Sequence, residues 1–265
     1  MLWKRSHLGR LFAGSVLLGL LWSLWTSPYS PAAFSRADAA LAAGQPLVAV
    51  ARYDAIAQSS FFESQRRVAL HRSANVWAVE LANPEQAQMR LETLVQMPLP
   101  QDELASVQAS LAALWVEERE ILSASQAFLE AFETAPTSPH AASRLINAAR
   151  LSGEAGKPKM ALELWTRLGF HFPDHGPLAA VGQGEIHLAE GDVQAALSLF
   201  EDASHTAINA DLEAVARLGA ATCLERLGNL DGALAEMDFI DLPEEVLLQR
   251  REGIRHRQSI GGGAF

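Results

Sequence analysis

Two stretches, Gly156-Lys-Pro-Lys-Met-Ala161-Leu-Glu-Leu-Trp165 and Gly191-Asp-Val-Gln-Ala-Ala196-Leu-Ser-Leu-Phe200, share one pattern. Each has a glycine five residues before an alanine and an aromatic residue four residues after it. Six such alanines, which we call the ladder alanines, occur along the chain: Ala49, Ala87, Ala124, Ala161, Ala196 and Ala233. Consecutive ladder alanines lie 38, 37, 37, 35 and 37 residues apart. A fixed period in this range indicates an array of small structural units that bury their apolar faces against one another.

Three other positions repeat with the same period. Four residues after the ladder alanine comes a large apolar residue: Tyr53, Leu91, Phe128, Trp165, Phe200 and Met237. Seven residues after it comes another apolar residue: Ile56, Leu94, Ala131, Leu168, Ala203 and Ile240. Twelve residues before it stands a residue that is small in five of the six units: Ala37, Asn75, Ala112, Ala149, Gly184 and Ala221. Since β-branched residues are sparse and no sustained period-two alternation occurs, the pattern predicts an all-α chain.

Turn residues divide the array into six predicted helix-turn-helix units. They cover about 33–60, 63–98, 101–136, 139–173, 176–208 and 211–242. Four of the turns have a glycine five residues before the ladder alanine, at Gly44, Gly156, Gly191 and Gly228. In the third unit the turn is formed by residues 117–120, Glu-Glu-Arg-Glu, which include no glycine. Beyond the repeat domain, 33–242, we predict a capping helix over 243–257 and a flexible tail over 258–265.

These features together resemble the tetratricopeptide repeat (TPR) family. The residues that carry the resemblance best are Leu145, Ala148, Ala149, Gly156, Ala161, Trp165, Leu168 and Pro173 in the fourth unit. The resemblance covers 33–242 and implies an α-solenoid whose first helices line a concave groove. It also implies a non-catalytic scaffold that binds a peptide, a helix or another protein's surface, with no cofactor.

The register of the repeat predicts which side chains face that groove. The predicted partner-binding residues are Arg72, Val76, Ile146, Asn147, Arg150, Val181, Glu185, Thr222 and Glu225, with Ala109, Ala113 and Leu218 at related positions. Asn147 and Arg150 are similar to one step of the carboxylate-binding pattern that some family members use. The neighbouring units place Ala109, Ala113, Val181 and Glu185 there instead of basic residues. We therefore expect a mixed, largely apolar groove that suits an apolar or helical partner segment.

The amino terminus has the pattern of a signal sequence or membrane anchor. Residues 1–7 form a short basic segment, and the run from Leu11 to Trp25 contains no charged residue. One interpretation is a transmembrane helix over 8–25 followed by a Ser/Pro linker over 26–32, with the basic end in the cytoplasm. The other is a signal peptide cleaved before Ala33. Both interpretations place the repeats outside the cytoplasm, in a bacterial periplasm or its equivalent.

The charge balance and the candidate reactive residues argue against nucleic acid binding and against metal or redox chemistry. The first 25 residues hold three of the 21 basic residues and none of the 31 acidic ones, so the rest of the chain has a formal charge of −13. Such a body repels nucleic acid. The single cysteine, Cys223, lies in an alanine-rich stretch and is interpreted as a buried, inert thiol. His171, Asp174 and His175 surround Pro173 in a turn, and we interpret them as loop residues without a metal.

Three functions fit this pattern. The chain is an anchored periplasmic adaptor that assembles or stabilises a membrane complex, a chaperone-like holder of exported proteins, or a non-catalytic subunit of an envelope enzyme for polysaccharide or cell-wall synthesis. A partner that copurifies in fixed ratio would favour the first or the third. Broad binding of unfolded chains would favour the second.

Overall fold

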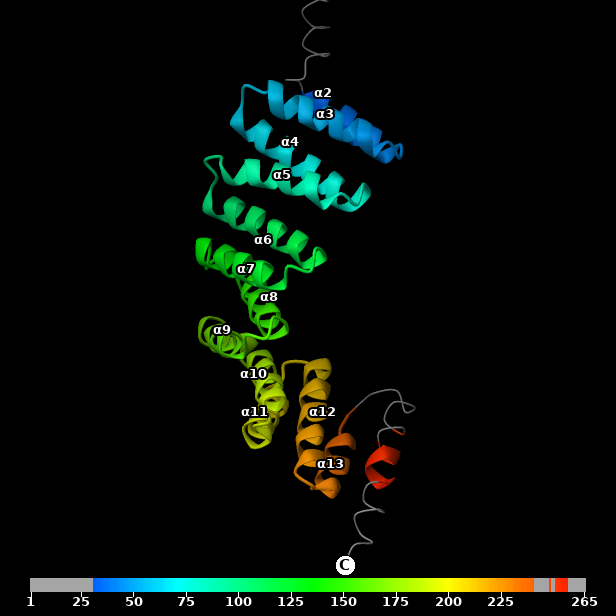
Figure 1. Ribbon diagram of the computed structural model, residues 1–265, viewed down its shortest axis with the longest axis vertical. Coiled ribbons are helices and arrows are strands. Elements are labelled where there is room, and N and C mark those ends of the chain that lie inside the picture. Colours follow the sequence, from blue (N-terminus) through cyan, green and yellow to red (C-terminus); the bar gives the residue numbers. More distant parts are fainter. Residues whose placement is uncertain (1–30, 241–247, 249–250, 257–265) are drawn as a thin grey trace, which may run out of the picture. The chain divides into compact units, whose positions relative to one another are not determined.

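The computed structural model describes residues 31–240, 248 and 251–256, and all regular elements within these residues are helices (Figure 1). The chain divides into two compact units, 1–114 and 115–265, which are described separately. One helix, α6 (Gln101–Glu117), begins in the first unit and ends in the second. The predicted all-α class is confirmed for the described residues.

The first unit contains two complete helix pairs. α2 (Pro31–Ala42) packs on α3 (Pro46–Ser59), and α4 (Glu63–Asn75) packs on α5 (Pro84–Val95). A π-helical turn, η1 (Val76–Glu80), extends α4. One core cluster runs through this unit, with Ala49, Tyr53 and Leu91 among its buried members.

The second unit continues with the same alternation of helices. Its helices are α7 (Ile121–Thr134), α8 (Ala141–Glu154), α9 (Pro158–His171), α10 (Gly176–Glu190), α11 (Val193–Thr206), α12 (Ala210–Arg226) and α13 (Leu230–Met237). A short 3-10 turn, η2 (Pro173–His175), joins α9 to α10. Each of these helices packs against the next one along the chain.

All six ladder alanines have no exposed surface. The large residues four positions later are also buried, with exposed fractions between 0% at Met237 and 8% at Phe128. Because an alanine at this point keeps the second helix of each pair close to its neighbours, the large side chain one turn later reaches the next helix pair. The repeat read from the sequence is therefore the packing pattern of the core.

Two of these large residues rest on glycines of the following first helix. A Cβ atom built on Gly182 would lie 2.2 Å from the Trp165 ring, and one on Gly219 would lie 2.5 Å from the Phe200 ring. Gly182 and Gly219 each stand fourteen residues before a ladder alanine. In these two places the ring of one pair therefore packs directly on the backbone of the next pair.

The second helix pair departs from the predicted register by one residue. Asn75, which stands where the other five units have a small residue, is exposed, and Ala74 is buried in its place. The π-helical turn explains the shift, because the Leu81 amide donates to the Val76 carbonyl five residues earlier (3.1 Å). A π turn inserts one extra residue into a helix. This inserted residue therefore accounts for the departure of Asn75 from the pattern of small residues at this position.

The turns between the paired helices share one backbone conformation. Gly44, Gly156, Gly191 and Gly228 have φ between +68° and +88°, as their glycines allow. In the other two units, the residues five before the ladder alanine are Ala82 (φ 46°) and Arg119 (φ 65°). The glycine-free turns therefore keep the left-handed conformation with side chains that disfavour it.

The predicted segments at the two ends lie partly or wholly outside the described residues. The predicted anchor, 8–25, and the linker up to residue 30 are outside them, as is the tail 258–265. Across the described part of the chain, no helix has the length and apolar character needed to cross a membrane. Within the predicted capping helix, 251–256 is helical, and Ile254 is fully buried against Ala233, Met237 and Ile240.

We expect Gly182→Ala to destabilise the protein by about 1–3 kcal/mol, because the added methyl group collides with the Trp165 ring. Alanine normally favours a helix over glycine by about 1 kcal/mol, so destabilisation here would reverse the usual sign. Gly176→Ala is the control, since nothing lies within 4 Å of a Cβ atom at this position. Denaturation followed by circular dichroism measures both. Equal stabilities of the two variants would show that the ring does not need the glycine.

We expect Arg119→Gly to stabilise the protein by about 1 kcal/mol, because glycine adopts a positive φ without steric cost. Gly156→Ala, at the equivalent turn, should destabilise it by a similar amount of about 1 kcal/mol. The free energy of unfolding from chemical denaturation checks both changes. A loss of stability in Arg119→Gly would contradict the explanation.

Candidate protein interaction surface

The first helices of the second unit, α8, α10 and α12, each present an equivalent side chain to solvent. Arg150, Glu185 and Thr222 stand eleven residues before a ladder alanine, and each directly follows a buried small residue. Arg150 and Glu185 are exposed, and Thr222 is half-buried. We call the solvent-facing residues of these three helices the first-helix face. α10 and α12 pack directly on each other, so their part of this face is continuous.

Most of the predicted partner-binding residues are accessible. Arg72, Arg150 and Glu185 are exposed, and Ile146, Asn147, Thr222 and Glu225 are half-buried. Arg72 and Arg150 already form ion pairs, with Asp38 and Glu154 respectively.

Two of the predicted residues, Val76 and Val181, are buried and cannot meet a partner. Val76 is 2% exposed, because the π-helical turn moves it from the surface into the core. Val181 is 4% exposed and packs in a cluster with Leu197 and Phe200. Its neighbours Gly182 and Gly184 lack side chains, so the rings of Trp165 and Phe200 come close to α10 and cover this part of it.

Glu185 has an electrostatic environment that differs from that of the neighbouring charged residues. None of the described residues donates a hydrogen bond to its carboxylate or forms an ion pair with it. Partial burial disfavours the charged form and raises the pKa of the Glu185 carboxyl above its usual value. A charged group held partly out of water without a counter-ion gains stability when a cation approaches it. Glu185 is therefore a point on the first-helix face that favours a basic group on a partner.

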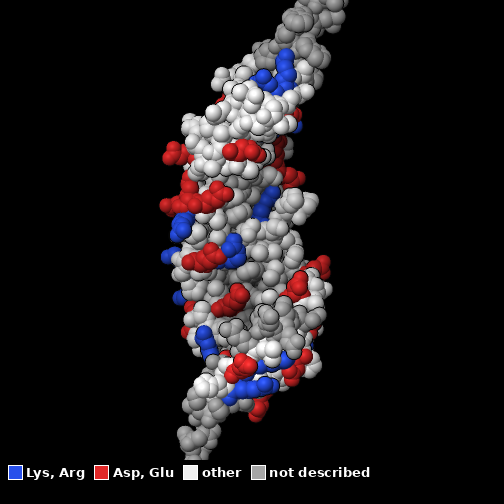
Figure 2. All heavy atoms as spheres, turned by 90° about the vertical axis from the view of Figure 1, so that its right-hand side faces the viewer, with Lys and Arg blue, Asp and Glu red and all other residues white. Residues whose placement is uncertain are grey.

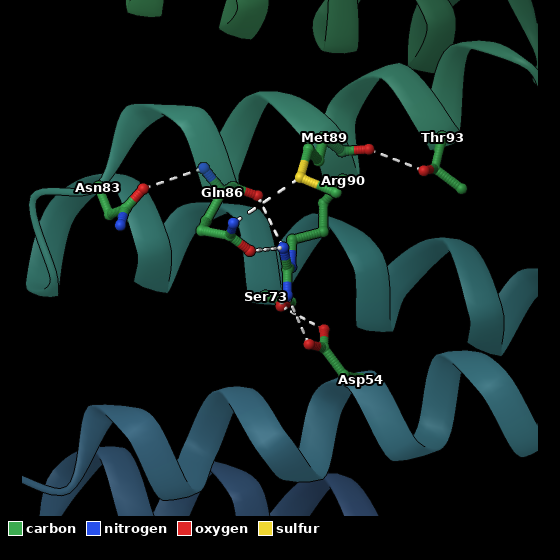
Figure 3. A network of polar contacts seen from close by, with 7 residues as sticks. All are labelled: Asp54, Ser73, Asn83, Gln86, Met89, Arg90 and Thr93. Atoms are coloured by element: carbon green, nitrogen blue, oxygen red, sulfur yellow. Dashed lines mark hydrogen bonds and ion pairs between the residues drawn. The ribbon is translucent and has the colours of Figure 1, made fainter.

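A polar network in the first unit joins three helices (Figure 3). Arg90 Nη2 on α5 lies 2.7 Å from Asp54 Oδ2 on α3, and Arg90 Nε donates to Ser73 Oγ on α4 (3.1 Å). The Ser73 hydroxyl donates to Asp54 Oδ1 (2.6 Å), and Arg90 also lies over the Trp77 ring (5.2 Å). These groups satisfy one another, so we interpret the network as structural.

The repeat pattern does not predict this network, although the sequence contains a signal for it. Asp54 and Arg90 are 36 residues apart, close to one repeat period, and carry opposite charges. Glu133 and Arg167, which also carry opposite charges and are 34 residues apart, likewise pair, with their side chains 3.2 Å apart.

The described residues show no arrangement suited to metal or thiol chemistry. Within the described ranges, no three His, Cys, Asp or Glu side chains converge as metal ligands would. His171 instead makes edge contacts with the rings of Phe132 and Phe170. Cys223 is fully buried, and burial raises the pKa of its thiol, which disfavours the reactive thiolate.

Surface charge is mixed on the face that Figure 2 shows, where acidic side chains are interspersed with basic ones. This distribution agrees with the net charge of −10. The drawn face carries no continuous basic stripe among its described residues.

Comparison with known proteins identifies the fold. No protein-family model matches the chain, and no curated protein matches it. Among solved structures, it is similar to YrrB, described as a TPR protein with an unusual peptide-binding site. The identity is 17%, covering 70% of this chain and 92% of YrrB, with a TM-score of 0.51. It is also similar to PilF of Pseudomonas aeruginosa (17% identity, 78% and 87% covered, TM-score 0.50) and to BtubC of P. vanneervenii (14%, 85% and 91%, TM-score 0.51). The described chain therefore has a TPR-like α-solenoid fold, as the resemblance implied.

We expect the Asp54–Arg90 pair to contribute more to stability than the exposed pair Arg150–Glu154. A double-mutant cycle of Asp54→Asn and Arg90→Gln should give a coupling of about 1–3 kcal/mol, since both side chains are largely shielded from solvent. The same kind of cycle on Arg150 and Glu154 should give less than about 0.5 kcal/mol. Equal couplings would show that the network does not join the helices.

Proposed function

We propose that this protein is a non-catalytic scaffold that holds a protein partner on the first-helix face of α8, α10 and α12. The Glu185 carboxylate carries the proposal, because it lies partly shielded on this face and has no counter-ion among the described residues. Ile146 supplies apolar surface nearby along the array, and Asn147 and Thr222 supply hydrogen-bonding groups. The partner segment would present apolar side chains and at least one Lys or Arg.

The fold and the absence of a reactive constellation in the described residues support a binding role. TPR-like solenoids are built to present extended surfaces, and one structure of similar fold, YrrB, is described as having a peptide-binding site. Fold alone does not fix function, so the proposal depends on the face itself.

We also propose that the chain is tethered to a membrane by residues 8–25, with residues 1–7 in the cytoplasm and the repeats in the periplasm. The support is the uncharged run from Leu11 to Trp25 behind Lys4, Arg5 and Arg10. The partner would then be a membrane or exported protein. The alternatives are a soluble periplasmic protein after cleavage before Ala33, a holder of exported chains, and an accessory subunit of an envelope enzyme.

A pull-down of the full chain in mild detergent tests both proposals. We expect one protein partner in fixed ratio, and an intact amino terminus when the recovered chain is sequenced by mass spectrometry. A chain that begins near Ala33, together with a diffuse set of exported proteins, would support the soluble holder and contradict the anchored scaffold.

Glu185→Lys should reduce recovery of that partner at least tenfold, because it replaces the shielded carboxylate with a like charge facing the partner's cation. Asp202→Lys is the matched control, since it makes the same kind of charge reversal at an exposed position of α11, a second helix. Unchanged recovery with Glu185→Lys, or an equal loss with both variants, would remove the first-helix face as the binding surface.

A further inference from the structure

A hollow of about 470 Å³ lies in the second unit, and none of its lining residues belongs to α8, α10 or α12. It is formed by α7 and by the beginning of α9. Leu122 and Gln126 line it from α7, and the stretch 156–160 lines it from the turn and first residues of α9. A volume of this size is within the range of ligand pockets, about 300–1,000 Å³, so it accommodates more than one side chain.

The charge of this hollow differs from that of the rest of the chain. The sequence has three lysines, Lys4, Lys157 and Lys159, and the last two line the hollow. Both are exposed, and none of the lining residues is acidic, although the chain has 31 acidic residues. Apolar atoms of Leu122, Pro158 and Met160 lie beside these two cations.

Lys157 stands where three of the other five units have a helix-capping residue, while Gln45 and Glu120 at the same position cap no amide with their side chains. Four residues before the ladder alanine, Asn83, Asp192 and Asn229 each accept a hydrogen bond from the backbone N–H three residues later, at 3.0–3.2 Å. Lys157 has a similar backbone conformation, φ −112° and ψ 65° against −120° and 85° at Asn83, but a lysine cannot accept this bond.

The first turn of α9 therefore keeps backbone donors for a ligand. Its first intrahelical bond runs from the Ala161 amide to the Lys157 carbonyl (3.0 Å). The N–H groups of Lys159 and Met160 precede it, and Pro158 has no N–H. Free N–H groups and the positive end of the helix dipole favour an anion at this place. Lys157 adds no side-chain cap to α9, whereas a carboxylate-binding site gains both a cation and uncapped amides.

We propose that this hollow is a second docking site, which binds an acidic peptide segment of a protein partner through one large apolar side chain flanked by carboxylates. The apolar side chain would rest on Leu122, Pro158 and Met160. The carboxylates would meet Lys157, Lys159 and the first amides of α9. This site goes beyond the proposed first-helix face, and its partner segment has the opposite charge from the one that Glu185 favours.

Lys157→Asn provides a sharp test, because it should stabilise the fold while removing the binding. Asparagine restores the cap found at Asn83 and Asn229, and the melting temperature should rise by about 2–4 °C. The probe is a fluorescein-labelled peptide with a central leucine between two pairs of glutamates, titrated by fluorescence anisotropy against the full chain in mild detergent. We expect saturable, salt-sensitive binding to the wild type and at least tenfold weaker binding to Lys157→Asn.

Two controls separate the site from general electrostatics. The double variant Arg52→Gln and Arg255→Gln removes two exposed positive charges elsewhere and should bind the peptide as the wild type does. A peptide with serine in place of the central leucine should bind at least tenfold more weakly. Equal binding of the serine peptide, or of Lys157→Asn, would overturn the proposal.

Lysine acetylation gives an independent readout. The bound peptide should protect Lys157 and Lys159 from an amine-acetylating reagent, while Lys4 reacts unchanged and serves as the internal reference. If Lys157→Asn proves unstable, Lys159→Gln decides in its place, since this exposed residue lies outside the cap position. Equal acetylation of all three lysines with and without peptide would overturn the proposal. Because Glu185→Lys leaves this hollow intact, failure at one site is distinguishable from failure at the other.

Discussion

The fold depends on helices that approach one another closely at alanines without exposed surface. Each ladder alanine is fully buried, and in five of the six units the residue twelve positions before it is also a buried Ala or Gly. A larger side chain at either place would force the helices apart, and the core has no empty space to absorb it. The large residue one turn later then reaches the next pair, where Gly182 and Gly219 leave room for the rings of Trp165 and Phe200. The alternation of small and large residues along the array therefore sets both the packing within each helix pair and the packing between neighbouring pairs.

The alternation made the fold predictable, since it produces a period of 35 to 38 residues that can be recognised in the sequence without knowledge of the structure. The ladder, the large residues four positions later and the apolar residues seven positions later are all buried, as the repeat predicted. The sequence could not show the π-helical turn, because an insertion of one residue inside a helix changes no residue type. That single residue moved Val76 from the predicted surface into the core. The sequence also could not show the left-handed backbone of Arg119, since this conformation is set by the two helices that the residue joins.

The candidate surfaces were less predictable, because they depend on which neighbours cover each residue. Val181 and Glu185 lie one helical turn apart on α10, yet Val181 is buried and Glu185 is exposed. The ion pairs between helices were also only partly predictable from the sequence. Asp54 and Arg90, and Glu133 and Arg167, join second helices of neighbouring pairs, and in both cases the arginine also lies over an aromatic ring, Trp77 or Phe132. The period places such residues opposite one another, but only the coordinates show the ring beneath the guanidinium.

Departures from the repeat carry information of two kinds, and local physics separates them. Asn75 departs because the backbone shifts by one residue, and the neighbouring Ala74 takes over its packing, so this departure is absorbed by the fold. Lys157 differs from the three units with a capping side chain, since its backbone keeps a similar conformation and no side chain caps α9, as is also the case at Gln45 and Glu120. A lysine in place of the cap that three other units have, beside a hollow with no acidic lining, is the pattern expected where function and folding compete. In a repeat protein the other units show which residues the fold accepts at a given position, and here they include both capped and uncapped helix starts. The lysines beside the hollow, rather than the missing cap, therefore distinguish the fourth unit from the others.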